Sequence, residues 1–256
     1  MRYFILALIT LSSTAFAKLE TKVIEYKEGD VTLEGYLAYD TKFKGPRPGV
    51  LVVHEWNGLD GYTKSRTEQL AKLGYIAFAA DIFGKGVRPS TMDEAAKVSS
   101  GYKANPELWR ARGVASLETL KAQKNVDGKK IAAIGYCFGG STVLEFARAG
   151  TDLNGVVSFH GNFATKLPLK GPGIVKTKVL VLHGANDPFV KQDEYEDFIE
   201  EMQKSKADWQ MISYGNAVHK FSNPEAGNDP SKGFAYDKSA DERSWAAMQT
   251  FFKEIF

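Results

Sequence analysis

Residues 131–140 read Ile-Ala-Ala-Ile-Gly-Tyr-Cys-Phe-Gly-Gly and contain the only cysteine of the 256-residue chain. The apolar run at the start is typical of a buried strand, and the pattern Gly-x-Cys-x-Gly after it is typical of a nucleophile elbow, the sharp turn between a strand and a helix. Gly135 and Gly139 leave room for this turn because they lack a Cβ atom. The segment predicts a parallel α/β sheet with Cys137 at a strand end as a nucleophile, and an inert buried cysteine is the alternative.

Two later segments provide the acid and the histidine that such a nucleophile needs. Residues 178–182 predict a buried strand, and Asp187 follows it in a loop. Residues 209–214 predict the next strand, and His219 lies just beyond its end. Loops at the carboxyl ends of neighbouring parallel strands converge on one crevice. Asp187 alone could be a turn residue and His219 a surface histidine, but the order Cys137, Asp187, His219 predicts a catalytic triad.

The other apolar runs predict an α/β-hydrolase type of architecture, a mostly parallel central sheet flanked by helices on both faces. Residues 22–26 and 32–38 alternate apolar and polar side chains, as an antiparallel hairpin at a sheet edge does. Nearly continuous apolar runs, which fit strands buried on both faces, occupy residues 49–54, 76–81, 130–134, 155–159 and 178–182, and helices are predicted at 63–73, 106–122, 140–149, 194–204 and 239–252. Residues 84–101 and 221–234 are expected to be irregular and to cover the active-site mouth.

The N-terminus has the pattern of a secretory signal peptide. Arg2 precedes an apolar run, and residues 15–17 form an Ala-x-Ala cleavage signal. The run is shorter than the roughly 20 residues that span a bilayer, so no stable membrane insertion is expected after cleavage. We expect residues 1–17 to be a signal peptide, residues 18–256 to form a single domain, and the protein to be exported, to the periplasm if the source is Gram-negative.

The composition is that of an ordinary globular domain, with 43% hydrophobic and 25% charged residues. A formal net charge of +2 provides no electrostatic footprint for nucleic acid, so no nucleic-acid partner is expected. The four histidines and one cysteine lack metal-ligand spacing, and therefore neither a metal nor another cofactor is expected. A monomer that acts on a small molecule is the expected form.

The chain resembles the dienelactone hydrolase family, a branch of the α/β-hydrolases. The matching segments are distributed along the whole mature chain, at residues 54–58, 80–84, 135–140, 183–187 and 217–221. The resemblance implies that Cys137, Asp187 and His219 are the triad. It also implies that Glu55 holds the resting thiol, where a carboxylate disfavours a second negative charge on sulfur.

The resemblance further implies an oxyanion hole formed by the backbone amides of Trp56 and Phe138. In this scheme His219 takes the thiol proton and returns it to the leaving group, while Asp187 orients the imidazole. The sulfur forms an acyl-enzyme thioester, which water resolves. The expected activity is hydrolysis of small carboxylic esters or lactones.

Substrate-binding residues are less well determined. Lys85 and Arg88 follow the predicted strand 76–81, where the resemblance implies a basic residue that grips a substrate carboxylate. His160 ends another strand and is expected either to line the pocket or to be held by neighbouring backbone. The position of the family's second arginine is Asn223, which favours a broader ester or lactone hydrolase.

Two other functions fit the same residues. A non-catalytic or redox-sensing binding protein on this fold would use the lone cysteine as a sensor, because an exported free thiol has no intramolecular disulfide partner. An acyltransferase would pass the acyl group to an acceptor other than water. Turnover of esters by the purified protein distinguishes the first of these from the hydrolase, and product analysis distinguishes the second.

Overall fold

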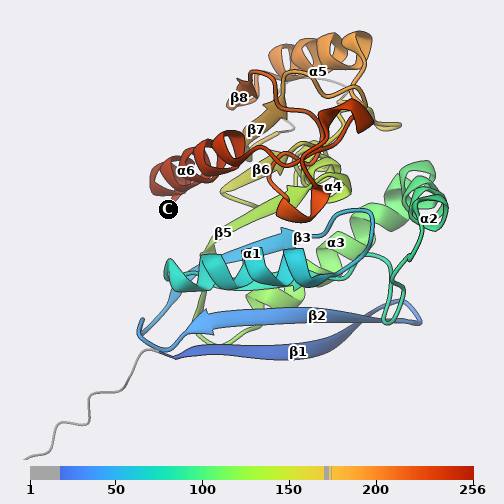
Figure 1. The fold of residues 1–256 in the computed structure, drawn as a ribbon. Coiled ribbons are helices and arrows are strands. Elements are labelled where there is room, and N and C mark those ends of the chain that lie inside the picture. The colour runs from blue at the N-terminus through green and yellow to red at the C-terminus, as the bar shows by residue number, and fades with distance from the viewer. Residues whose placement is uncertain (1–17, 170–172, 174) are drawn as a thin grey trace, which may run out of the picture.

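The computed structural model describes residues 18–169, 173 and 175–256, so the predicted signal peptide lies outside the described residues. Within them one mixed sheet has the strand order β1-β2-β4-β3-β5-β6-β7-β8 (Figure 1). The strands are β1 (Leu19–Glu28), β2 (Val31–Asp40), β3 (Arg47–Val53), β4 (Ile76–Ala80), β5 (Val126–Tyr136), β6 (Gly155–Phe159), β7 (Lys178–Gly184) and β8 (Trp209–Tyr214). The first two strands pair antiparallel at one edge, β2 pairs antiparallel with β4, and the remaining pairs are parallel.

Helices cover both faces of this sheet. On one face lie α1 (Gly61–Lys72) and α6 (Lys238–Ile255), as Figure 1 shows, and on the other lie α2 (Met92–Ala104), α3 (Pro106–Lys121), α4 (Phe138–Arg148) and α5 (Gln192–Ser205). The predicted mostly parallel sheet with helices on both faces is confirmed. Among the described helices, none combines the length and the apolar character needed to cross a lipid bilayer.

The buried stretches of the central strands are mostly apolar because each one contributes to two cores. Along β3, Leu51 and Val53 pack into the cluster on the α3 and α4 side, whereas Val50 and Val52 pack into the cluster on the α1 and α6 side. Successive side chains of a strand point to opposite faces, so a strand that is covered on both sides needs apolar residues at every position.

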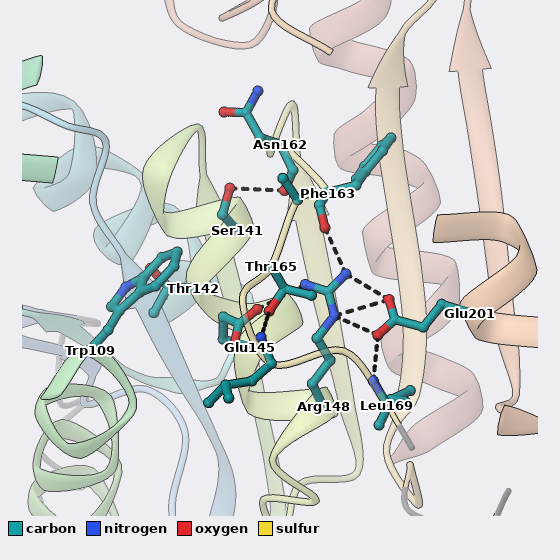
Figure 2. A network of polar contacts seen from close by, with 12 residues as sticks. Trp109, Ser141, Thr142, Glu145, Arg148, Asn162, Phe163, Thr165, Leu169 and Glu201 are labelled. Carbon is teal, nitrogen blue, oxygen red and sulfur yellow. Dashed lines mark hydrogen bonds and ion pairs between the residues drawn. The ribbon is translucent and has the colours of Figure 1, made fainter. Parts of the chain in front are cut away.

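Helix α4, which begins directly after Cys137, is fixed to its surroundings by a buried polar network (Figure 2). The guanidinium of Arg148 donates to Glu145 at 2.9 Å, to Glu201 of α5 at 2.8 Å and to the carbonyl oxygen of Phe163 at 2.7 Å. A buried charge is tolerated when it is paired and its donors are satisfied, as they are here. The network therefore ties the helix that follows the elbow to α5 and to the segment after β6.

The expectation of irregular structure over residues 84–101 is wrong, because α2 occupies most of this stretch. The helix buries only Ala95 and Ser99 and therefore lacks an apolar stripe that would reveal it in the sequence. A local signal was present nonetheless: Thr91 caps the helix by accepting from the backbone N–H of Glu94, in the spacing of a capping box. Residues 221–234 contain only the short 3₁₀ turns Pro224–Ala226 and Pro230–Lys232.

Candidate active site

Cys137 lies at the junction of β5 and α4 with backbone angles φ 52° and ψ −113°. A positive φ is uncommon for a residue with a side chain and persists only where the surrounding structure imposes it. A Cβ atom on Gly135 would lie 2.0 Å from the carbonyl oxygen of Gly139, and one on Gly139 would lie 2.2 Å from that of Val53. Both glycines of the Gly-x-Cys-x-Gly pattern are thus required by close backbone contact.

The three residues that the sequence singled out lie in one chain of contacts. Nε2 of His219 is 3.0 Å from Sγ of Cys137, and Nδ1 of His219 is 2.7 Å from Oδ2 of Asp187. The backbone N–H of Phe189 donates to the other carboxylate oxygen of Asp187 at 2.9 Å. All three residues are buried, with exposed fractions of 8% for Cys137 and 6% each for Asp187 and His219. The geometry is that of a nucleophile, a base and an orienting acid.

The surroundings of His219 favour its protonated form. Burial alone lowers the pKa of His219, but the charge of the Cys137 thiolate and the hydrogen bond to Asp187 outweigh burial and raise the pKa to about 10. An imidazolium between a thiolate and a carboxylate is stabilised on both sides. His219 is accordingly suited to hold a proton between the sulfur and the carboxylate.

Two backbone amides, those of Trp56 and Phe138, belong to residues that line the same cavity as Cys137. Phe138 begins α4, where the first N–H groups of a helix have no intrahelical acceptor. Trp56 follows β3, and in the part of the chain that the structure describes neither its amide N–H nor that of Phe138 donates a hydrogen bond. Both residues line the cavity together with Cys137. Unpaired backbone N–H groups beside a nucleophile are the kind of donor that can receive a developing oxyanion.

The cavity above Cys137 has a volume of about 610 Å³. Helix α2 and the loop 221–234 supply part of its wall, as do the elbow and the loop after β3. Its wall combines aromatic and other apolar side chains with three lysines: Trp56, Met92, Phe138, Phe189, Phe234, Lys103, Lys220 and Lys232. No carboxylate of the described residues lines it, and no group of three His, Cys, Asp or Glu side chains among them could hold a metal ion.

Glu55 is buried, with an exposed fraction of 1%, and its carboxylate is bound by residues other than the thiol. Oε2 of Glu55 lies 2.8 Å from Nζ of Lys220 and accepts from Nδ2 of Asn223 at 2.9 Å. Burial raises the pKa of Glu55, and the charge of Lys220 opposes this. Asn223 therefore contributes to the site through Glu55, a role that the sequence did not reveal.

None of the three predicted substrate-binding residues lines the cavity. Lys85 is exposed and pairs with Glu25 of β1 at 2.5 Å. Arg88 donates to the carbonyl oxygen of Leu59 at 2.9 Å and so fixes a loop. His160 is fully buried behind the elbow, where its Nδ1 is 3.1 Å from the backbone nitrogen of Cys137.

Comparison with known proteins identifies the family of this chain. The model of the dienelactone hydrolase family matches residues 33–256. The chain belongs to the dienelactone hydrolase family. The resemblance drawn from the five sequence segments is confirmed, and family membership makes the chain a hydrolase.

Solved structures and curated proteins agree with this family assignment. The structure described as m3DLH has a TM-score of 0.89 and is 39% identical, over 93% of this chain and 99% of its own. A dienelactone hydrolase-like promiscuous phosphotriesterase from metagenomic libraries has a TM-score of 0.86 and is 40% identical, over the same shares of 93% and 99%. Protein usf of Aquifex pyrophilus is 28% identical, over 91% of this chain and 98% of its own length.

Proposed function

We propose that this dienelactone hydrolase family member is an exported hydrolase of small carboxylic esters or lactones that works through a Cys-His-Asp triad. The observation that carries the proposal is the continuous contact from Sγ of Cys137 through His219 to Asp187 at the floor of an apolar cavity. Export rests on the signal-peptide pattern of residues 1–17.

The reaction begins with attack of the Cys137 thiolate on the carbonyl carbon, which forms a C–S bond and places the carbonyl electron pair on oxygen. The amides of Trp56 and Phe138 receive this oxyanion, and each such donor is worth roughly 3 kcal/mol where the effect has been probed. When the tetrahedral intermediate collapses, the C–O bond breaks and Nε2–H of His219 protonates the leaving alkoxide or enolate. Neutral His219 then takes a proton from water, whose oxygen attacks the thioester carbonyl carbon and forms a C–O bond. When this second tetrahedral intermediate collapses, the C–S bond breaks, the carboxylic acid leaves, and the Cys137 thiolate and the protonated His219 are restored.

The lining of the cavity suggests the substrate class. Its aromatic wall fits an apolar acyl or leaving group. Lys220 is paired with Glu55, but Lys103 and Lys232 line the cavity with no lining carboxylate, which favours a substrate that carries a negative charge. We therefore propose that esters or lactones bearing a carboxylate are accepted, with Lys103 and Lys232 near the charge. Lys85 and Arg88 have no part in this proposal because they lie off the cavity.

Replacing both Lys103 and Lys232 by methionine should raise KM for a carboxylate-bearing lactone and leave KM for a neutral aryl ester unchanged. Both lysines are exposed, so each contributes no more than about 1 kcal/mol, and the pair should change KM by roughly threefold to tenfold. Lys85→Met is the matched control, since it removes an exposed lysine that does not line the cavity. Equal effects on charged and neutral substrates would remove the two lysines from substrate binding.

Ester turnover should decline as pH rises through about 10, the pKa of His219. The protonated imidazole is the acid that delivers a proton to the leaving group, and a group with a raised pKa keeps its proton until the pH exceeds that value. The measurement is kcat/KM against pH for an aryl ester between pH 7 and 11, because kcat/KM reports the pKa values of the free enzyme. A rate that keeps rising beyond pH 10.5 with folded protein would contradict this assignment.

The proposal is tested by screening the purified protein against aryl esters, lactones and a neutral aryl phosphotriester. The phosphotriester is included because one 40% identical relative is described as a promiscuous phosphotriesterase. Turnover that yields free acid supports hydrolysis, whereas acyl transfer to an added alcohol in preference to water supports an acyltransferase. Absence of turnover on every substrate, together with reversible oxidation of Cys137, favours the redox-sensing binding protein.

A further inference from the structure

The ring of His160 contacts the backbone of Cys137, and His160 does not line the cavity. Its Nδ1 lies 3.1 Å from the backbone nitrogen of Cys137, and that nitrogen also lies 3.0 Å from the carbonyl oxygen of Phe159. A backbone N–H can only donate, so Nδ1 of His160 must accept and carries no proton. His160 itself has a positive φ of 41°, so two neighbouring non-glycine residues hold uncommon backbone conformations at this point.

The other ring nitrogen begins a buried chain of hydrogen bonds. Nε2 of His160 is 2.7 Å from Oγ of Ser222, which is 2.8 Å from the hydroxyl of Tyr62 on α1. Tyr62 donates to the carbonyl oxygen of Ser222 at 3.1 Å and accepts from Nε of Arg66 at 3.2 Å. Arg66 pairs with Asp241 of α6. His160, Ser222, Tyr62 and Arg66 are all buried.

Only one arrangement of protons satisfies all the donors and acceptors of this hydrogen-bond chain. With Nδ1 accepting from Cys137, a neutral ring carries its proton on Nε2 and donates to Oγ of Ser222. Ser222 then donates to Tyr62, and Tyr62 donates to the backbone carbonyl of Ser222. Adding a proton to Nδ1 would set two N–H groups against each other, which costs free energy in a buried site.

Burial and the charges around the His160 ring also favour its neutral form. His160 is fully buried, and burial lowers its pKa well below the ordinary value. The charged groups that face it, His219, Lys220 and Arg66, lower the pKa further. The ring of His160 also contacts that of His219 edge to face, with centroids 5.4 Å apart. A neutral ring beside the His219 imidazolium avoids a repulsion between two cations.

We propose that His160 is a positioning residue: as the neutral Nε2–H tautomer it holds the backbone N–H of Cys137, and the chain Ser222–Tyr62–Arg66–Asp241 fixes the ring against α1 and α6. The elbow then keeps the conformation in which Sγ of Cys137 lies 3.0 Å from Nε2 of His219. This inference rests on the proposed triad, but the tautomer itself can be observed without any turnover.

The direct test is nitrogen NMR of the full protein labelled with ¹⁵N-histidine, with the signals of His160 assigned by comparison with His160→Asn. We expect an unprotonated Nδ1 and a protonated Nε2 at every pH from 5 to 9. A protonated Nδ1 or a cationic ring in this range would overturn the proposal. Failure of ester turnover in the wild type would instead count against the proposed function and leave the tautomer result intact.

The kinetic test compares two variants with the wild type. His160→Phe removes the acceptor and should lower kcat per alkylatable thiol by about tenfold to a hundredfold with little change in KM, because small displacements of reacting groups have effects of that size. His160→Asn retains an acceptor near the position of Nδ1 and should recover part of the rate. Unchanged kcat in His160→Phe would overturn the proposal.

Two serine variants provide a matched pair, and this test remains valid if His160→Phe does not fold. Ser222 and Ser116 are both fully buried and both lie 2.8 Å from a tyrosine hydroxyl, of Tyr62 and Tyr26 respectively. Ser222→Ala takes the acceptor from His160 and should lower kcat about threefold to tenfold, since the ring loses its fixed tautomer. Ser116→Ala should lose similar stability and keep kcat. Equal kcat in the two variants would show that the chain does not position the elbow.

Discussion

Cys137→Ala should lower kcat for ester hydrolysis by at least about 10⁴-fold, because the loss of a nucleophile disables a triad as a unit. His219→Ala should have an effect of similar size, since the thiol loses the base at 3.0 Å and the leaving group loses its acid. The double variant should be little worse than either single variant, as groups that act together are not additive. The measurement is single-turnover kinetics with an aryl ester and purified, folded variants.

Chemical modification tests the same assignment without mutation. Cys137 is the only cysteine, so one equivalent of iodoacetamide reports on this sulfur alone. Activity should fall in step with alkylation, and prior incubation with a slow ester substrate should protect the thiol. A fully alkylated enzyme that keeps its rate would show that another group attacks the substrate.

The central part of the fold was predictable because its residues obey strong local constraints. A stretch of strand covered on both faces must be apolar throughout, and residues 49–53 of β3 and 131–134 of β5 meet this condition. The elbow was visible because close backbone contacts admit only glycine at 135 and 139. Cys137, Asp187 and His219 each follow the end of a strand, and the parallel topology brings these strand ends together. Helix α2 was missed because only Ala95 and Ser99 of it are buried, so it shows no strong apolar stripe.

The partners of individual site residues could not be read from the sequence. Glu55 and Lys220 are separated by 165 positions in the chain, and nothing in either segment indicates that their charges meet in a buried pair. Lys85 stands where the resemblance implies a substrate-binding cation, but Glu25 on the edge strand β1 binds it instead. Such pairings depend on side-chain directions that only the folded backbone determines.

Lys220→Met should destabilise the protein by about 3 kcal/mol or more at neutral pH, because it leaves the Glu55 carboxylate buried without its counter-charge. Glu55 is 1% exposed, and Asn223 would be its remaining hydrogen-bond donor among the described residues. The measurement is the free energy of unfolding from urea titrations of wild type and variant at pH 5 and pH 7.5.

The pH dependence of this effect has a definite sign. Burial raises the pKa of Glu55 in the folded state, and removing Lys220 takes away the largest influence that lowers it. Between the unfolded and folded pKa values the native state binds more protons, so the variant is most stable below the ordinary pKa of a glutamate and loses stability as pH rises through the raised folded value. The difference from wild type should therefore be smaller at pH 5 than at pH 7.5.

Two further variants distinguish the effect of breaking the buried pair from the effect of losing any lysine. Lys85→Met removes an exposed ion pair with Glu25 and should change stability by less than about 1 kcal/mol. Adding Glu55→Gln to Lys220→Met removes the orphaned charge and should restore much of the lost stability at pH 7.5, since replacing both members of a buried pair is far less costly than replacing one. If Lys220→Met is as stable as Lys85→Met at both pH values, the buried pair of Glu55 and Lys220 contributes nothing to the stability of the fold.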